Sequence, residues 1–253
     1  MAQANSPPSK TTGRLVVVTG SSGGIGEAVV KAFEEAGDKI ERLDRNPSRT
    51  EARTRLLSLE DAKQVERHIE EIEADCGPIE VVVNAAGIAS HGALLDCGPE
   101  EISRAFLSNV IGPYNVARAC GQRMVRRGWG CIVNISSVSA RLPRFNQGPY
   151  CISKAGLRML TQILGLELAS QGVRCFSVSP GTTATPLLNE QLKSYSKDNI
   201  VAGVPQHFRT GIPSGRLVQP SEVAAAILAL TGPGISSFQL NDLVIDGGQS
   251  LGM

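Results

Sequence analysis

The sequence predicts a single-domain α/β fold, a doubly wound and mostly parallel β-sheet with helices on both faces. Short apolar runs rich in β-branched residues alternate with amphipathic stretches, and such alternation requires crossover connections between parallel strands. A glycine cluster at 20–26 separates the first apolar run from the first amphipathic stretch. No Ser/Pro-rich linker divides the 253 residues. We therefore expect a flexible polar tail at 1–12 and one domain over 13–253.

The elements follow in order from these patterns. The run at 15–18 is four aliphatic residues long, as expected for a strand buried on both faces. The stretch at 60–74 places Val65, Ile69 and Ile72 at helical spacing, with charged residues on the opposite face. Strands are expected at 15–18, 39–43, 79–83, 131–135, 173–178 and 243–245, and helices at 28–36, 60–74, 100–127, 149–170 and 220–230. The segment 182–217 lacks clear periodicity, and so long an excursion in a compact domain predicts a substrate lid.

Composition excludes several classes of protein. The formal net charge is +1 and aromatic residues make up 4%, which argues against a nucleic-acid partner. No apolar run approaches the roughly 18 residues of a membrane span, and the first residues lack the apolar stretch of a secretory signal. The six cysteines form no CxxC pair and the three histidines show no metal-ligand spacing. We expect a cytoplasmic protein with buried free thiols and with no metal site, membrane partner or nucleic-acid partner.

The glycine cluster TGSSGGIG (19–26) is typical of a phosphate-binding turn between a strand and a helix. Glycines allow the tight turn and let the backbone approach a pyrophosphate, while the helix N-terminus supplies N–H donors. The expected cofactor-binding residues of this turn are Gly20, Ser22, Gly24, Ile25 and Gly26. A plain tight turn would use the same residues, so the strand before and the helix after carry the interpretation.

An acidic residue ends the second expected strand and indicates which dinucleotide binds. Asp44 lies about 20 residues after the glycine turn, where a carboxylate can accept hydrogen bonds from ribose hydroxyls and would repel a 2′-phosphate. The neighbouring Arg42 and Arg45 could bind a phosphate instead, and Arg45 is a further candidate for cofactor contact. The pattern favours NAD over NADP.

A serine, a tyrosine and a lysine form the candidate reactive group. Tyr150 and Lys154 are four residues apart in an expected helix and therefore share one face. A free phenol has a pKa of about 10, and a nearby ammonium together with the positive nicotinamide ring would stabilise the phenolate and lower that pKa. The Ser137 hydroxyl could hold the substrate oxygen while Tyr150 takes its proton. Taken alone, a Tyr-x-x-x-Lys pair is common on protein surfaces.

The motifs together resemble the short-chain dehydrogenase/reductase family, whose fold is of the Rossmann type. The matching segments occur in the family's order and spacing: TGSSGGIG (19–26), VNAAG (83–87), Asn109 in SNVIG, NISS (134–137), YCISK (150–154), Pro180-Gly181 and DGG (246–248). The resemblance implies that Tyr150 is the general base, that Ser137 orients the hydroxyl, and that Lys154 lowers the tyrosine pKa and binds the nicotinamide ribose. It also implies that Asn109 holds a water linked to Lys154.

The same resemblance implies further contacts to a bound NAD. Asn84, Ala85, Ala86 and Gly87 would line its adenosine side, and Pro180, Gly181, Thr183 and Thr185 its nicotinamide side. Many relatives carry an aspartate that contacts adenine where this chain has Ser58, which can still form a hydrogen bond. Relatives are usually homotetramers, and the apolar side chains of 157–166 suit either a partner or the core.

The last third of the chain is similar to the 2,3-dihydro-2,3-dihydroxybenzoate dehydrogenases. The similarity lies in VRCFSVSPGTTATPL (173–187), FRTGIPSGRLVQPSEVAAAILAL (208–230), LNDLVIDGGQSLGM (240–253) and LPR (142–144). It implies an NAD-dependent oxidation of a ring hydroxyl in a small carboxylate substrate. Arg144 is the candidate carboxylate ligand beside Ser137 and Tyr150, since a guanidinium binds a carboxylate with two bonds. Arg141, His207 and Arg209 are weaker candidates.

Three other functions stay open at this point. The amino analogue 2,3-dihydro-3-hydroxyanthranilate has the same carboxylate and C3 hydroxyl, and the sequence does not discriminate at C2. A 3-oxoacyl carrier-protein reductase would prefer NADPH and a basic docking surface, against which Asp44 and the near-neutral charge both argue. A non-catalytic nucleotide-sensing module would be expected to have lost part of the Asn-Ser-Tyr-Lys set, and all four residues are present.

Overall fold

Seven parallel strands form the centre of the molecule, in the order β3-β2-β1-β4-β5-β6-β7. The structure is a computed structural model that describes residues 13–46, 54–189 and 195–252. The strands are β1 (Leu15–Thr19), β2 (Lys39–Asp44), β3 (Arg55–Leu56), β4 (Ile79–Asn84), β5 (Gly130–Ile135), β6 (Val173–Pro180) and β7 (Asp242–Ile245). The α/β fold with one parallel sheet is therefore confirmed, and the expected tail at 1–12 lies outside the described residues.

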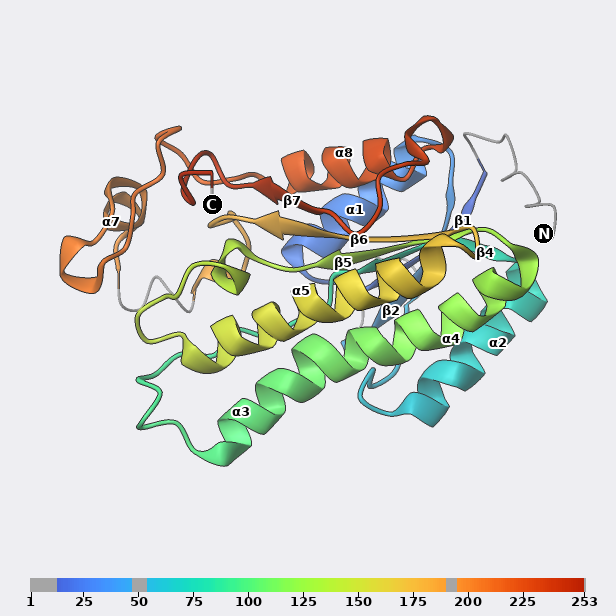
Figure 1. Ribbon diagram of the computed structural model, residues 1–253, viewed down its shortest axis with the longest axis horizontal. Helices are drawn as coiled ribbons and strands as arrows, with labels where there is room; N and C mark the ends of the chain where they lie inside the picture. The colour runs from blue at the N-terminus through green and yellow to red at the C-terminus, as the bar shows by residue number, and fades with distance from the viewer. Residues whose placement is uncertain (1–12, 47–53, 190–194, 253) are drawn as a thin grey trace.

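Helices cover both faces of the sheet (Figure 1). On one face lie α1 (Gly24–Glu35) and α8 (Pro220–Leu230), and on the other lie α2 (Ala62–Cys76), α4 (Gly112–Arg127) and α5 (Gly148–Ala169). Two cores result, because alternate strand residues point to opposite faces. In β1, Val16 and Val18 belong to the core under α1 and α8, whereas Val17 belongs to the core under α2 and α4.

The strand order places a crevice beside β1. That strand pairs with β2 on one side and with β4 on the other, so the direction of winding reverses between β1 and β4. Ligands of open α/β sheets bind outside the carboxyl ends of the strands at this reversal. The short α7 (Lys197–Ala202), within the expected lid, lies beyond the same end of the sheet (Figure 1).

The long helix expected at 100–127 is continuous but not uniform. It consists of α3 (Pro99–Phe106), a π turn at Leu107–Ile111 and α4. The Gly112 N–H bonds to the Leu107 carbonyl oxygen across this turn. A π turn inside an α-helix is uncommon and occurs often at functional sites, and this one contains Asn109.

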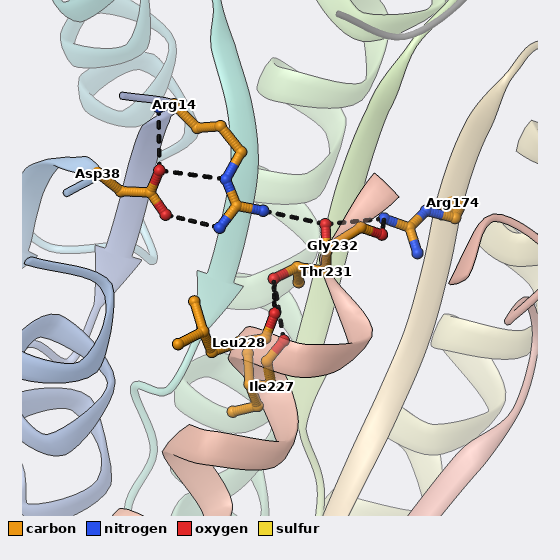
Figure 2. A network of polar contacts seen from close by, with 7 residues as sticks. All are labelled: Arg14, Asp38, Arg174, Ile227, Leu228, Thr231 and Gly232. Atoms are coloured by element: carbon orange, nitrogen blue, oxygen red, sulfur yellow. Dashed lines mark hydrogen bonds and ion pairs between the residues drawn. The ribbon is translucent and has the colours of Figure 1, made fainter. Parts of the chain in front are cut away.

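A network of polar contacts joins the amino ends of β1, β2 and β6 to the end of α8 (Figure 2). Arg14 forms a two-bond ion pair with Asp38, at 3.2 Å from Nε and 2.6 Å from Nη2, and its Nη1 donates to the Thr231 carbonyl. Arg174 donates to the carbonyls of Leu230, Thr231, Gly232 and Ile235. The last carbonyls of a helix lack intrahelical partners, so the two arginines cap α8 here.

One strand and the burial of the cysteines differ from what the sequence predicted. The two-residue strand β3 was not expected, because Arg55–Leu56 is too short to give a pattern. All six cysteines are free, but Cys120, Cys131 and Cys175 are buried whereas Cys76 is exposed. Among the described residues, no helix is long and apolar enough to cross a membrane.

Candidate active site

Two adjoining cavities open at the carboxyl ends of the strands. The β1–β2 cavity is lined by residues that follow β1, β2 and β4, including Gly20, Ser22, Asp44, Arg45 and Ala86. The β5–β7 cavity is lined by residues that follow β5, β6 and β7, together with α5 residues, including Ser137, Tyr150, Lys154, Gly181 and Gln249. Ala85 and Gly87 line both cavities, so an extended ligand such as a dinucleotide could lie across the two.

The glycine turn is shaped for close backbone approach. Gly20 adopts φ +62°, and a Cβ there would lie 2.5 Å from the Ala86 Cα of the neighbouring loop. A Cβ at Gly24 would lie 2.7 Å from the Thr185 side chain, which brings the glycine turn and the expected lid together. Helix α1 begins at Gly24 after an N-cap glycine without a capping side chain. Its first N–H groups are therefore available to an anion.

Asp44 is held at the rim of the β1–β2 cavity. Its carboxylate accepts hydrogen bonds from the Ser22 N–H at 2.9 Å and the Asn46 N–H at 3.0 Å. Arg45 also lines this cavity, whereas Arg42 is buried and pairs with Glu34 at 3.1 Å. Of the two arginines considered as phosphate ligands, only Arg45 lies at the cavity.

The reactive group comes together in the β5–β7 cavity. Ser137 follows β5, and its hydroxyl accepts a hydrogen bond from the Ser139 N–H at 3.1 Å as the N-cap of a short 3-10 turn. Tyr150 and Lys154 lie one turn apart on α5, and Tyr150 is hydrogen-bonded to Ser137. The Lys154 Nζ lies 5.9 Å from the centre of the Tyr150 ring and donates to the Ile135 carbonyl at 2.8 Å.

Burial acts on both titratable groups. It raises the pKa of Tyr150, and the hydrogen bond to Ser137 lowers it by a smaller amount. Burial lowers the pKa of Lys154 to about 8. The chain by itself therefore keeps Tyr150 as a neutral phenol at pH 7. The lowering of this pKa by Lys154 together with a bound, positively charged nicotinamide stays a prediction.

Asn109 ties the π turn to the site. Its Oδ1 accepts from the Ile88 N–H at 2.8 Å, and its Nδ2 donates to the Ile88 carbonyl at 3.1 Å and to Ser153 Oγ at 2.9 Å. Ser153 donates in turn to the Tyr150 carbonyl. The side chain thus fixes the loop after β4 against α5, and its role as the ligand of a water stays a prediction.

The residues expected on the nicotinamide side of the cofactor lie together at one cavity. Pro180, Gly181, Thr183 and Thr185 all line the β5–β7 cavity, as does Ile25 of α1. The Thr183 hydroxyl donates to the Gly181 carbonyl at 2.9 Å, which closes the turn after β6. Thr183 and Thr185, which belong to the expected lid, therefore line the same cavity as Tyr150.

Two residues expected to contact the cofactor, Asn84 and Ser58, are not among those that line the β1–β2 cavity. Asn84 is buried and lines neither cavity, because its amide donates to Asn134 Oδ1 at 2.9 Å and joins β4 to β5. Ser58 also lies outside the residues lining the β1–β2 cavity, although Leu59 and Glu60 belong to them. The Asn84 side chain points toward Asn134 inside the sheet, a direction that its position in the motif does not reveal.

Arginines supply the positive charge of the β5–β7 cavity. Arg144 and Arg209 both line it, and the Arg144 Nη2 is buried with no hydrogen-bond partner. Burial lowers the pKa of both groups, that of Arg209 to about 10, and the charge of Arg144 contributes to the shift of Arg209. The two guanidinium groups are thus close enough to repel each other, and an anion between them would relieve that repulsion.

Of the three weaker candidates for binding the substrate carboxylate, one lines the cavity and two do not. Arg209 lies at the cavity, but Arg141 pairs with Asp242 at 2.9 Å and does not line it. His207 stacks on Phe145, with ring centres 4.3 Å apart, and its Nδ1 lies 2.6 Å from the Tyr195 hydroxyl. It thereby joins the expected lid segment to the loop that carries Arg144 without lining the cavity.

Sequence reasoning missed Gln249 and Thr182, which also line the β5–β7 cavity. Gln249 follows the DGG segment at the carboxyl end of β7. In a parallel sheet, residues just past the carboxyl ends of the strands meet at one edge. That position was the available signal for Gln249.

The fold and the site together define a nicotinamide-dependent oxidoreductase. A family model described as enoyl-(acyl carrier protein) reductase matches residues 20–250. The chain is 33% identical to the 2,3-dihydro-2,3-dihydroxybenzoate dehydrogenase of Bacillus subtilis (strain 168), over 95% of this chain and 97% of that protein. It is 35% identical to the same enzyme of Escherichia coli (strain K12), over 95% and 98%.

Solved structures agree with these relatives. The ligand-free aldohexose dehydrogenase of Thermoplasma acidophilum superposes with a TM-score of 0.86 at 30% identity, over 96% of each chain. A gluconate 5-dehydrogenase of Burkholderia cenocepacia in complex with NADP and tartrate gives a TM-score of 0.86 at 30% identity, over 95% of this chain and 96% of that one. The chain belongs to the short-chain dehydrogenase/reductase family.

Proposed function

We propose that the protein oxidises the C3 hydroxyl of 2,3-dihydro-2,3-dihydroxybenzoate with NAD, giving aromatic 2,3-dihydroxybenzoate for siderophore or other secondary-metabolite biosynthesis. The observation that carries the proposal is the pair of arginines, Arg144 and Arg209, in the cavity that holds Tyr150. Among the described residues, those lining this cavity include no Asp or Glu. The cavity thus suits a small carboxylate, and two relatives at 33% and 35% identity bear the name of this dehydrogenase.

The residues that would hold the cofactor fit a dinucleotide. The turn at Gly20 and Gly24 leaves no room for side chains, and the open N-terminus of α1 suits a pyrophosphate. The Asp44 carboxylate stands where ribose hydroxyls could donate to it, which favours NAD. Arg45 beside it is the residue through which NADP could bind. When bound, the oxidised nicotinamide supplies the hydride acceptor and a positive charge.

The chain's own residues orient the substrate and move its proton. Arg144 binds the carboxylate and thereby sets the position of the ring. Ser137 and Tyr150 hold the C3 hydroxyl, and Tyr150 takes its proton as the C3 hydrogen leaves with its electron pair. The phenolate form of Tyr150 accepts this proton and becomes a neutral phenol. Lys154, held by the Ile135 carbonyl, and the positive charge of a bound nicotinamide would stabilise that phenolate beforehand. The product ketone then loses the C2 proton and becomes aromatic, which drives the oxidation forward.

An assay with purified protein tests this proposal. NAD and NADP are each offered with 2,3-dihydro-2,3-dihydroxybenzoate, with 2,3-dihydro-3-hydroxyanthranilate and with a simple secondary alcohol, and reduced nicotinamide is followed by absorbance. We expect turnover with a ring acid, with a higher kcat/KM for NAD than for NADP. Turnover of the simple alcohol alone would contradict the proposed substrate, and a preference for NADP would contradict the role of Asp44.

We also propose that the protein is a cytoplasmic homotetramer. Met159, Ile163 and Leu166 on α5 are exposed apolar side chains, as are Ile111 and Tyr114 at the start of α4. Of the apolar residues expected either at a partner or in the core, Leu157 is fully buried, whereas Ile163 and Leu166 are exposed. Light scattering on the eluted protein would measure the mass, and a monomer would contradict the assembly.

A further inference from the structure

A buried amide in the β5–β7 cavity has no place in the mechanism above. Gln249 lines this cavity with Tyr150, and its side chain is fully buried. Its Nε2 atom has no hydrogen-bond partner. A buried donor without a partner costs the desolvation of that group, and such groups in a folded protein call for an explanation. A ligand oxygen in the cavity would supply the missing acceptor.

The orientation of this amide is fixed by its other end. The Thr182 N–H and the Thr182 hydroxyl both lie 3.1 Å from Gln249 Oε1, and a backbone N–H can only donate. The Thr182 Oγ1 accepts from Arg209 Nη2 at 3.0 Å. Because a guanidinium has no acceptor, the Thr182 proton points to Gln249. The chain Arg209–Thr182–Gln249 therefore leaves the Nε2 donor as the free end of the amide.

Other side chains of the cavity also offer hydrogen-bond donors or positive charge. Arg144 presents a buried Nη2 without a partner, and Arg209 and Lys154 add further positive charge. Among the described lining residues there is no carboxylate to balance a second cation. A hydroxyl oxygen can accept a hydrogen bond from an amide N–H, whereas an ammonium has no lone pair to offer. The cavity is thus built for oxygen substituents.

We infer that Gln249 is a specificity-determining residue, whose Nε2 donates a hydrogen bond to the oxygen at C2 of the ring acid. The enzyme then selects the 2-hydroxy acid, because the aliphatic amine of the 2-amino analogue is protonated at neutral pH and would face a donor and two arginines. This inference rests on the proposed function, since it concerns a second substituent of the same substrate.

The isosteric variant Gln249→Glu tests the inference. It keeps one oxygen for Thr182 and replaces the Nε2 donor with an acceptor. For the unaltered protein we expect kcat/KM for the 2-hydroxy acid to exceed that for the 2-amino acid by at least about tenfold. In Gln249→Glu we expect the ratio of the two values to fall at least about tenfold. Equilibrium binding of ADP, the part of NAD expected in the β1–β2 cavity, should be unchanged, because Gln249 does not line that cavity.

The exposed Gln171, at the end of α5 and far along the helix from Tyr150, provides the matched control. Gln171→Glu makes the same chemical change and should leave the substrate ratio unchanged. If Gln249→Glu does not fold, Gln249→Met removes the donor without adding charge and should reduce the preference for the 2-hydroxy acid. Equal use of both acids by the unaltered protein, or an unchanged ratio in the folded variant, would overturn the inference. Oxidation of neither acid would overturn the proposed function, and the inference with it.

Discussion

Arg14 and Arg174, at the amino ends of the strands, are held differently from Arg144, at the carboxyl ends. At the amino ends of the strands, each guanidinium nitrogen of Arg14 donates a hydrogen bond, to Asp38 or to Thr231 (Figure 2). Arg174 donates to four carbonyls around the end of α8. At the carboxyl ends, Arg144 keeps a buried nitrogen without a partner, and burial lowers its pKa.

This difference teaches how to separate arginines that hold a fold together from arginines that bind ligands. Residue type and burial do not separate them, because both ends bury guanidinium groups. The number of partnered nitrogens separates Arg14 from Arg144, because a guanidinium whose nitrogens all donate has none left for a ligand. Arg127, at the amino end of β4, also has a buried Nε without a partner but lines neither cavity. An unpartnered nitrogen therefore indicates a ligand site only where it belongs to a residue that lines a cavity, as Arg144 does. Substitutions at the amino end should therefore change stability, and those at the carboxyl end should change activity.

The largest effect is expected at the carboxyl end, from Tyr150→Phe. Removing the phenol oxygen removes the proton acceptor, so turnover should fall roughly 10⁴-fold, or about 5 kcal/mol of transition-state stabilisation. The melting temperature and the Kd for NAD should stay near those of the unaltered protein. Steady-state kinetics and calorimetry measure the two effects, and activity retained by the variant would remove Tyr150 from the role of base.

At the amino end, Arg14→Met should lower the free energy of unfolding by about 4 kcal/mol, because it leaves the buried Asp38 carboxylate without its partner. The two side chains are only 6% and 0% exposed, so solvent does not compensate. Denaturant unfolding measures the loss, while kcat of the folded fraction should be unchanged. The double variant Arg14→Met/Asp38→Asn should recover part of the loss. A variant as stable as the parent would show that the fully partnered Arg14 does not stabilise the fold.

Arg144→Met makes the matching change at the other end and should have the opposite result. The variant should raise KM for the carboxylate substrate about 100-fold, as expected for losing a charged hydrogen bond worth roughly 2 to 3 kcal/mol. Its free energy of unfolding should match or exceed that of the parent, since the lost group has an unpartnered nitrogen in the fold. A large loss of stability with KM unchanged would contradict the comparison.

The smallest effect concerns the pH dependence of stability. The pKa of Lys154 is lowered from 10.5 to about 8 by burial, so below pH 8 the native protein holds a buried charge at a cost. Lys154→Met removes this cost and should raise the free energy of unfolding at pH 7 by about 2 kcal/mol, after the lost bond to Ile135 is subtracted. The gain should shrink as the pH rises above 8, because the native lysine becomes neutral while the unfolded one stays charged, and should reach zero about one pH unit below 10.5, where the remaining cost of the charge equals the lost bond to Ile135. Urea unfolding at several pH values, without added cofactor, measures the trend, and a gain that grows with pH would contradict it.

Much of the fold and of the reactive group could be predicted from the sequence, because these depend on local patterns. The aliphatic run of β1, the glycine turn after it and the four-residue spacing of Tyr150 and Lys154 each carry their own signal. Parallel strands bring their carboxyl ends to one edge, so the assembly of these motifs followed from the fold class.

The remainder depends on contacts between distant segments, which no local pattern reveals. The partners of Arg141 and Arg209 decided which of them lines the cavity, and Asp242 and Thr182 lie far from them in sequence. Asn84 belongs to a matching motif, yet its amide joins two strands inside the sheet. The place of Gln249 after β7 could be inferred from the sequence, but its unpartnered Nε2 depends on its bonds to the distant Thr182.

The π turn at Leu107–Ile111 has a consequence for the faces of the long helix. One additional residue in a helical turn rotates everything after it by about 100°. On one side of the turn α3 packs against α5 beside the site, and on the other α4 packs against α2. The two halves of this continuous helix, α3 and α4, therefore turn different faces toward α5 and α2. Deleting one residue of the turn would restore a regular helix and put α3 and α4 out of phase with their partners, with Asn109 turned away from Ile88.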